Sequence, residues 1–299
     1  MSAESVLSVD GLTVRYGRRT VLEGVSLDVP RGSVFALLGR NGMGKSSFVR
    51  CALGQQKPAA GTARLFGRDA WTSRAAAMAR IGVVPEEPDA PPEMTADELV
   101  RFCRPLYAAW DDTVARSILD RLDVPRRVAF EKLSKGQKGT VMLALALAPM
   151  PDLLVLDDPT LGLDIVARRA LYDEIIGTLA DRGTTAFVTT HDLAGIEGIA
   201  ERVGILRDGR LVVIEEMESL KERFRRLRCG GSDGGFSWAP FDVVQALERD
   251  WGRQAVVTNY SEERLAAFEA RRGVADVEVG ALDLEEIFLA VVAPTGAGA

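Results

Sequence analysis

The fold of this chain is decided by one short stretch, Gly39-Arg40-Asn41-Gly42-Met43-Gly44-Lys45-Ser46. It matches the pattern GxxxxGK[ST], in which glycines let the backbone curl until successive N–H groups point inward. Such a loop cradles phosphate oxygens, and the N-terminus of a following helix favours their negative charge. The lysine can reach the phosphates, and the serine hydroxyl can ligate Mg²⁺. We therefore expect this stretch, with the adjoining Ser47, to bind the phosphates of a nucleotide.

The segments around this loop have the character that its chemistry requires. Val34–Leu38 is a continuous apolar run after a turn, which indicates a buried strand, and a helix is expected from about Lys45. Leu153–Leu156 and Thr185–Thr189 indicate two further buried strands. Helices are expected over about 137–148, 165–179 and 193–202. Strands that alternate with helices predict an α/β fold with a largely parallel core sheet.

Other segments predict additions to this core. Leu7–Tyr16 and Val21–Val29 alternate apolar and polar residues and predict strands, which we assign to an antiparallel β part, with further short strands over 62–84. Helical spacing begins at Thr95 and continues to about Leu122, where apolar side chains share one face. We expect a helical subdomain over about 88–150.

Two carboxylates follow directly on a buried strand, at Asp157 and Asp158. A carboxylate at this point can hold Mg²⁺ beside the phosphates, and we assign that role to Asp157. Asp158 can then accept a proton from the attacking water or orient it. The same pattern also suits an ordinary helix cap, so its meaning depends on the phosphate loop.

Composition excludes several other classes of protein. The chain has 299 residues, with 37 Lys and Arg against 43 Asp and Glu, so its net charge is −6. A mildly acidic chain argues against sequence-independent binding of nucleic acid, and none is expected as a partner. The three cysteines show no CxxC spacing and indicate neither a disulfide framework nor a zinc site. No apolar run approaches the roughly 18 residues of a spanning helix, and we expect no signal peptide.

Three further motifs resemble those of the ABC transporter ATPases, over about residues 5–220. Leu133-Ser134-Lys135-Gly136-Gln137 is similar to the family signature LSGGQ. Leu161-Gly162-Leu163-Asp164 is similar to the D-loop that follows the acidic strand. Thr189-Thr190-His191-Asp192 is similar to the switch-histidine segment. The motifs occur in the family's order, so the resemblance implies a P-loop NTPase fold of the ABC ATPase type.

The resemblance also implies cofactors, partners and residue roles. Two copies, identical or not, would pack head to tail with ATP and Mg²⁺ between them. The phosphate loop of one copy would face Ser134, Lys135, Gly136 and Gln137 of the other, and Asp164 of the D-loop would lie nearby. By the same resemblance Tyr16 stacks on adenine, and His191, the only histidine, contacts the γ-phosphate. Hydrolysis would remove the ligand that joins the copies and let them separate.

The chain departs from the family pattern at two positions of the expected catalytic site. Glu86 stands where the Q-loop normally has glutamine, and its carboxylate would bind Mg²⁺ more strongly, so we count it among the catalytic and metal-binding residues. Asp158 stands where the family usually has a catalytic glutamate, which is one methylene longer. We therefore hypothesise slow but not absent hydrolysis. Two smaller departures are Lys135 in place of a glycine and the pair Gly139-Thr140.

A branch of the family is indicated by two segments. Residues 88–127 resemble the helical subdomain of bacterial drug- and antibiotic-exporter ATPases, and 282–288 resemble the end of that branch. This implies a separate membrane permease as partner, with the chain peripheral on the cytoplasmic face of the cell membrane. Two alternatives stay open, a hydrolysis-impaired subunit paired with a competent one and a soluble ABC ATPase without a transport role. The second usually has a coiled-coil insertion or two ATPase halves, and neither is present.

The C-terminal part has a different composition. Three arginines near Arg223 precede 229–235, a Gly-rich segment that we interpret as a turn or linker. Beyond it we expect a strand at 255–259, a helix at 262–272 and a strand at 277–279. The predicted organisation is an ATP-binding domain over 1–222, a small α+β accessory domain over 223–293, and a disordered tail over 294–299.

Overall fold

The computed structural model describes residues 4–160, 165–230, 236–249, 252–271 and 273–293, and its contacts divide the chain into two compact units. The first unit is Met1–Ile214 and the second is Glu215–Ala299. The division falls earlier than the sequence boundary of 222/223. Helix α8 (Met217–Arg223) groups with the second unit, because Arg223 bonds to Glu215 and donates to the carbonyl oxygen of Thr258 at 2.7 Å.

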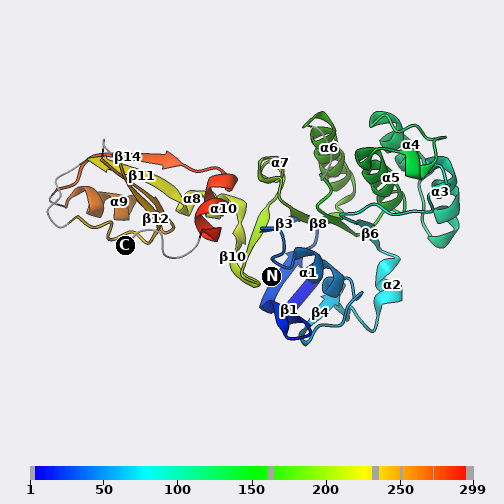
Figure 1. Ribbon diagram of the computed structural model, residues 1–299, viewed down its shortest axis with the longest axis horizontal. Coiled ribbons are helices and arrows are strands. Elements are labelled where there is room, and N and C mark those ends of the chain that lie inside the picture. Colours follow the sequence, from blue (N-terminus) through cyan, green and yellow to red (C-terminus); the bar gives the residue numbers. More distant parts are fainter. Residues whose placement is uncertain (1–3, 161–164, 231–235, 250–251, 272, 294–299) are drawn as a thin grey trace. The chain divides into compact units, whose positions relative to one another are not determined.

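The core of the first unit is a six-stranded sheet in the order β10-β9-β3-β8-β7-β6. Strands β6 to β9 and β3 pair in parallel, as the sequence predicts. These strands are β3 (Val34–Gly39), β6 (Ile81–Val84), β7 (Leu153–Asp157), β8 (Thr185–Thr190), β9 (Arg202–Arg207) and β10 (Arg210–Glu216). Every residue of β3, β7 and β8 is buried, because helices and a second sheet cover both faces (Figure 1).

The second sheet is antiparallel, in the order β2-β1-β4-β5, and confirms the predicted antiparallel part. Its strands are β1 (Ser5–Tyr16), β2 (Arg19–Pro30), β4 (Ala60–Leu65) and β5 (Arg68–Asp69). Figure 1 shows this sheet and α1 on one side of the six-stranded sheet and α5 and α6 on the other. Phe35, Phe48 and Phe187 stack with ring centroids 5.5–5.7 Å apart. These contacts join α1 to β3 and β8, each worth about 1 kcal/mol beyond the buried area.

The helices of the first unit differ from the sequence prediction in three places. They are α1 (Lys45–Ala52), α2 (Arg74–Met78), α3 (Ala96–Cys103), α4 (Asp112–Arg121), α5 (Lys135–Leu147), α6 (Ile165–Arg182) and α7 (Leu193–Glu197). The single helical stretch expected over 95–122 is interrupted by a short 3₁₀ helix, Arg104–Leu106, where Pro105 stands at the second position. Helix α2 lies where only strands were expected, and α7 ends before the predicted 202. Helices α3, α4 and α5 lie together as a subdomain (Figure 1).

The second unit is an antiparallel sheet in the order β12-β13-β11-β14 with helices. Its elements are α8, β11 (Arg225–Gly230), β12 (Val243–Arg249), β13 (Gly252–Val257), α9 (Glu262–Glu269), β14 (Ala275–Ala281) and α10 (Leu284–Val292). Its core includes Leu227, Phe241, Val257 and Phe268. The expected linker was wrong at its first two residues, which end β11, since Cys229 is buried in that core. Residues 231–235 and the expected tail lie outside the described residues.

No helix in the described ranges combines the length and apolar character needed to cross a membrane.

Candidate functional site

The glycine-rich loop joins the end of β3 to the start of α1. Gly42 and Gly44 have φ angles of 79° and 101°, which L side chains rarely adopt. At Gly44, a Cβ atom would also lie 2.6 Å from Cδ2 of Leu22 in β2. This position therefore requires glycine for its backbone conformation, and a side chain here would also have to displace the side chain of Leu22.

Lys45 is the first residue of α1, and its side chain is buried in the loop that it follows. Its Nζ donates to the carbonyl oxygen of Gly39 at 2.6 Å. Burial lowers the pKa of Lys45, and the charges of Asp158, Asp157 and Glu86 oppose this shift without cancelling it. An ammonium held among carboxylates at a helix N-terminus is suited to a multiply charged phosphate and a metal ion together.

A pocket of about 410 Å³ opens above this loop. Ten of the predicted residues line it, namely Tyr16, Asn41, Gly42, Gly44, Lys45, Ser46, Ser47, Glu86, Asp157 and Asp158. Gly39, Arg40 and Met43 belong to the same loop without lining the pocket. The lining residues come from four places in the sequence, and the fold brings them to the carboxyl ends of β3, β6 and β7. Crevices at that edge of a parallel sheet are where α/β proteins bind ligands.

The end of β7 supplies the first carboxylate. Asp157 is buried and accepts a hydrogen bond from the hydroxyl of Thr189, on the neighbouring strand β8. The main-chain N–H of Asp158 donates to the carbonyl oxygen of Thr189 at 2.8 Å and lies 3.2 Å from its hydroxyl. Thr189, which is fully buried, thus contacts both carboxylate residues.

Asp158 has a left-handed backbone with φ 51°. Its Oδ2 lies 2.6 Å from Nδ1 of His191, so the predicted switch histidine joins the site through this contact. Its Oδ1 is buried and has no hydrogen-bond partner among the described residues. A buried carboxylate oxygen without a donor is costly, and it suits a ligand or water that supplies one.

Few oxygen atoms in the pocket could ligate a cation. The hydroxyl of Ser46 lies 3.5 Å from Oε2 of Glu86, which follows β6, and Asp157 lines the same pocket. Within the described ranges no group of three or more His, Cys, Asp or Glu side chains could hold a metal by itself. Mg²⁺ usually takes one or two carboxylates, with waters and substrate phosphates completing its shell. The oxygens of Ser46, Asp157 and Glu86 fit that kind of site.

Tyr16 closes the pocket at the end of β1 and is 45% exposed. Its hydroxyl donates to Oε1 of Gln56 at 2.7 Å and accepts from Arg50 at 3.2 Å. Burial raises the pKa of Tyr16, but the hydrogen bonds with Ser47, Arg50 and Gln56 outweigh it and leave the pKa below the ordinary value. The hydroxyl is therefore anchored to α1 and the turn after it, while the ring keeps an exposed face.

The signature residues lie elsewhere on the same chain. Ser134 caps α5, accepting from the N–H of Gln137 at 3.2 Å, and Gln137 Oε1 accepts from the N–H of Ser134 at 3.0 Å. None of Ser134, Lys135, Gly136 and Gln137 lines the phosphate pocket, and Ser134 and Lys135 are exposed. The hydroxyl of Thr140 donates to the carbonyl oxygen of Gly136 at 3.2 Å. Asp164 lies outside the described residues.

Sequence reasoning missed four residues near the pocket. Arg19 and Val21 line it, and Arg50 and Gln56 hold Tyr16. The signal for Arg19 was available, because a tight turn after Tyr16 pairs Tyr16 with Arg19 across the hairpin. No local pattern marks Arg50 or Gln56, which come near Tyr16 through tertiary packing.

Comparison with known proteins identifies the family. The ABC transporter family model matches residues 22–161. The chain is 36% identical over 214 residues to a Nod factor export ATP-binding protein of Paraburkholderia xenovorans, covering 70% of each chain. It is 34% identical over 281 residues to a fluoroquinolones export ATP-binding protein of Mycobacterium tuberculosis, covering 92% of this chain and 93% of that protein. The latter match includes both units.

A solved structure supports the same assignment. An ATP-binding subunit of an ABC transporter is 28% identical and superposes with a TM-score of 0.66, covering 73% of this chain and 92% of that one. The chain belongs to the ATP-binding proteins of the ABC transporter family.

Proposed function

We propose that this chain hydrolyses Mg·ATP in a site shared between two ATPase subunits and thereby drives export by a separate membrane subunit. The observation behind this proposal is the separation of the phosphate pocket from the signature. Lys45 and Asp158 line the pocket, whereas Ser134 is exposed at the start of α5 and does not. A capped helix start with free N–H groups suits a γ-phosphate, so a second subunit can supply it.

In this proposal different residues of the pocket bind different parts of the nucleotide. The N–H groups of the loop and Lys45 bind the β- and γ-phosphates, and Tyr16 offers its exposed ring to the adenine. Ser46, Asp157 and Glu86 would hold Mg²⁺, which would supply positive charge beside the phosphates. Ser134 and Gly136 of the second subunit contact the γ-phosphate from the opposite side. Lys135, Gln137 and Asp164 of that subunit also belong to this half of the site.

The catalytic step in this proposal uses the free oxygen of Asp158. Oδ2 of Asp158 holds His191, and Oδ1 remains available to accept a proton from the attacking water. The imidazole of His191 is 46% exposed, so its other nitrogen can reach a bound phosphate. The shorter side chain leaves the carboxylate close to β7, which is the reason to expect slow hydrolysis.

A hydrolysis-impaired subunit is the second candidate, and the same contact favours it. If the contact with His191 keeps the carboxylate away from water, the chain binds ATP without turning it over and depends on a competent partner. Single-turnover hydrolysis by the chain alone, compared with its complex purified from cells, separates the two candidates. Turnover by the chain alone rejects the impaired subunit.

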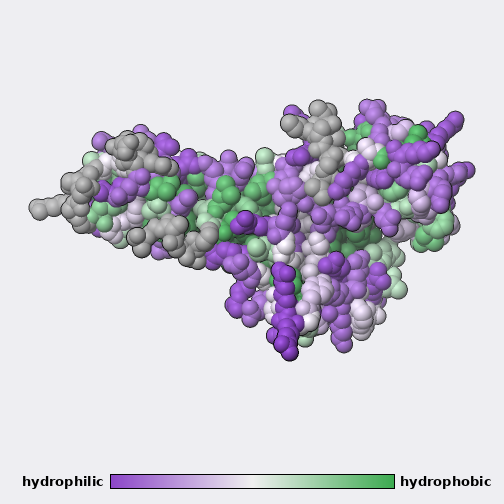
Figure 2. Space-filling view, viewed as in Figure 1, coloured by the Kyte–Doolittle hydropathy of each residue, from purple (hydrophilic) through white to green (hydrophobic). Residues whose placement is uncertain are grey.

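Two observations support a membrane partner and an export role. Phe102 and Leu106, at the end of α3 and just beyond it, are 59% and 68% exposed. Figure 2 shows hydrophobic, green surface among hydrophilic, purple surface in the region of the helices α3 to α5. Apolar side chains in such a position suit a short helix of another protein. Both curated relatives compared above are named as export proteins. The chain would then act at the cytoplasmic face of the membrane.

Mg·ATP-dependent dimerisation tests the proposal. We expect the Asp158→Asn variant to convert from monomer to dimer when Mg·ATP is added, in analytical ultracentrifugation. Adding Lys45→Ala to that variant should prevent the conversion. A chain that stays monomeric with Mg·ATP, alone and with its co-purified membrane partner, would overturn the proposal.

A further inference from the structure

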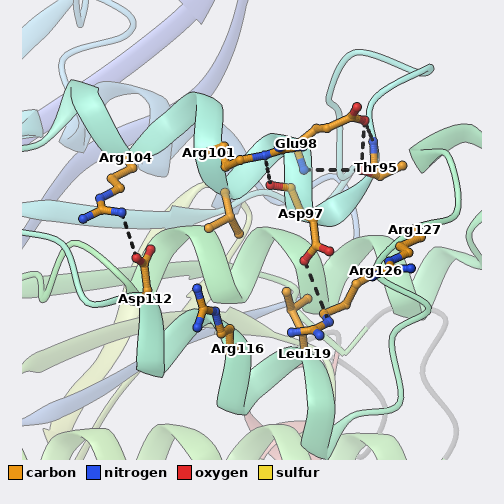
Figure 3. Close-up of a pocket in the computed structure, with 11 residues that line it drawn as sticks. Thr95, Asp97, Glu98, Arg101, Arg104, Asp112, Arg116, Leu119, Arg126 and Arg127 are labelled. Atoms are coloured by element: carbon orange, nitrogen blue, oxygen red, sulfur yellow. Dashed lines mark hydrogen bonds and ion pairs between the residues drawn. The ribbon is translucent and has the colours of Figure 1, made fainter.

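A second pocket, of about 780 Å³, lies between α3 and α4 and shares no lining residue with the phosphate pocket. Figure 3 shows Arg104 and Asp112 at one end, Asp97 and Arg126 at the other, and Arg116 between them. Its volume falls in the range of about 300–1,000 Å³ that holds small ligands.

Positive charge is in excess in this pocket. Five arginines line it, Arg101, Arg104, Arg116, Arg126 and Arg127, against three carboxylates, Asp97, Glu98 and Asp112. The surplus is two positive charges in a chain whose net charge is −6. A local basic cluster on an acidic protein therefore needs an explanation other than overall composition.

The three carboxylates already have partners. Glu98 accepts from the N–H and the hydroxyl of Thr95 at 2.8 Å each, in the cap of α3. Asp112 accepts from Arg104 at 3.0 Å and from Trp110 at 2.8 Å. Asp97 lies 3.8 Å from Nε of Arg126, which is an ion pair without a hydrogen bond. Two of the arginines, Arg104 and Arg126, thus form ion pairs with carboxylates of the pocket.

The other three arginines form no ion pair with a described carboxylate, although the charge of Arg101 adds to the hydrogen bonds from Thr95 that lower the pKa of Glu98. The side chains of Arg116 and Arg127 form no hydrogen bond or ion pair with any described residue, and both are exposed. Arg101 donates its Nε only to the carbonyl oxygen of Asp97 in its own helix, at 3.3 Å. Their guanidinium groups keep a planar set of N–H donors that suits the oxygens of a phosphate.

We propose that this pocket binds a phosphate-bearing anion through Arg101, Arg116 and Arg127. Like charges on one pocket wall repel each other, and a ligand with two negative charges removes that repulsion while it fills the unused donors. Val100 and Leu119 give the pocket some apolar lining, which allows the phosphate to belong to a larger molecule. The ligand is either a free phosphate compound or the headgroup of an anionic lipid.

Calorimetric titration with inorganic pyrophosphate tests the first source. The titration uses a Lys45→Ala background, because the phosphate loop would otherwise compete for the probe. We expect binding, weakened about tenfold or more by the pair Arg116→Ala and Arg127→Ala. The matched control is the pair Arg64→Ala and Arg74→Ala, two exposed arginines outside the pocket with the same loss of charge. Binding within twofold of the parent is expected for that control.

Flotation with vesicles tests the second source. Vesicles of phosphatidylcholine with phosphatidylglycerol are compared with vesicles of phosphatidylcholine alone, with the same variants. Vesicle binding that needs phosphatidylglycerol and is lost only in the Arg116 and Arg127 pair assigns the site to a lipid headgroup. Pyrophosphate binding without vesicle binding assigns it to a free phosphate compound. If neither probe binds, or if both arginine pairs lower binding equally, the proposed site does not exist.

Discussion

Asp158 and His191 are joined by a contact of 2.6 Å between Oδ2 and Nδ1, although 33 residues separate them in the chain. Asp158 has a left-handed backbone, and its N–H donates to the carbonyl oxygen of Thr189. One carboxylate oxygen orients the imidazole, and the other has no partner among the described residues. One oxygen of Asp158 is therefore engaged by His191, while the other is available to a water molecule.

A longer carboxylate side chain at position 158 should raise the rate of ATP hydrolysis. We expect Asp158→Glu to hydrolyse ATP faster than the native chain, because one more methylene brings the carboxylate nearer to the attacking water. Asp158→Asn should lose about 10²-fold or more, as expected for removal of a general base. Steady-state ATPase assays at saturating Mg·ATP check both changes. A rate for Asp158→Glu at or below that of the native chain would remove side-chain length as the limit.

Thr189 should act as a positioning residue for both carboxylates. Thr189→Val keeps the shape and removes the hydroxyl that donates to Asp157. Loss of this bond to a buried carboxylate costs about 1–3 kcal/mol. Hydrolysis should then need a higher Mg²⁺ concentration for half-maximal rate. Thr189→Ser is the control, because it keeps the hydroxyl and loses only a methyl group. Equal Mg²⁺ dependence in the two variants would show that the hydroxyl has only a structural role.

Lys45 should link ATP binding to proton uptake. Burial holds the pKa of Lys45 below its ordinary value of 10.5, and a phosphate beside the ammonium favours the charged form and raises this pKa. The complex therefore binds more protons than the free chain between the two pKa values, so affinity for ATP should fall as pH rises through that range.

Calorimetry in two buffers of different ionisation enthalpy measures this uptake at alkaline pH. Lys45→Arg is the control, because a guanidinium stays protonated in that range. The uptake should be present in the native chain and absent in Lys45→Arg. The same uptake in both would assign the proton to another group, for which Tyr16 is the nearest alternative.

Gly44 should tolerate no side chain. We expect Gly44→Ala to lose about 1–3 kcal/mol of stability from the strained backbone alone, with more from the contact with Leu22. Gly139→Ala is the matched control, because Gly139 lies inside α5 and a Cβ there meets nothing within 4 Å. That control should gain up to about 1 kcal/mol. Thermal or urea unfolding compares them, and equal stability would refute the strain at Gly44.

Most of the first unit could be predicted because its sequence signals are local. Continuous apolar runs marked the three central strands, and the motifs marked ten of the residues that line the phosphate pocket but not Arg19 and Val21. Three elements were not predicted from the sequence, each for a physical reason. Helix α2 is too short to show a period, Pro105 broke a helical stripe that continued beyond it, and the arginines of β11 concealed a strand with buried Leu227 and Cys229.

The contacts within the site could not be predicted in the same way. Asp158 pairs with His191 from a backbone with positive φ, and no residue pattern shows this angle, since aspartate adopts positive φ only occasionally. Thr189 was quoted as part of a motif, but its bonds to the β7 carboxylates follow from the register of β7 with β8. The arginine pocket combines residues from α3, α4 and the loop after it, which only the fold brings together.

The most direct test of the shared site changes Ser134 without uncapping α5. Aspartate and asparagine both cap helices as well as serine does, so Ser134→Asp and Ser134→Asn should fold alike, while only the former places a negative charge opposite the γ-phosphate. We expect Ser134→Asp to bind ATP as a monomer with native affinity yet lose Mg·ATP-dependent dimerisation and hydrolysis, and Ser134→Asn to retain most of both. Mixing Ser134→Asp with Lys45→Ala should restore part of the activity, because one site of the mixed dimer has both intact halves. Hydrolysis at the native rate by Ser134→Asp alone would contradict a site completed by a second subunit.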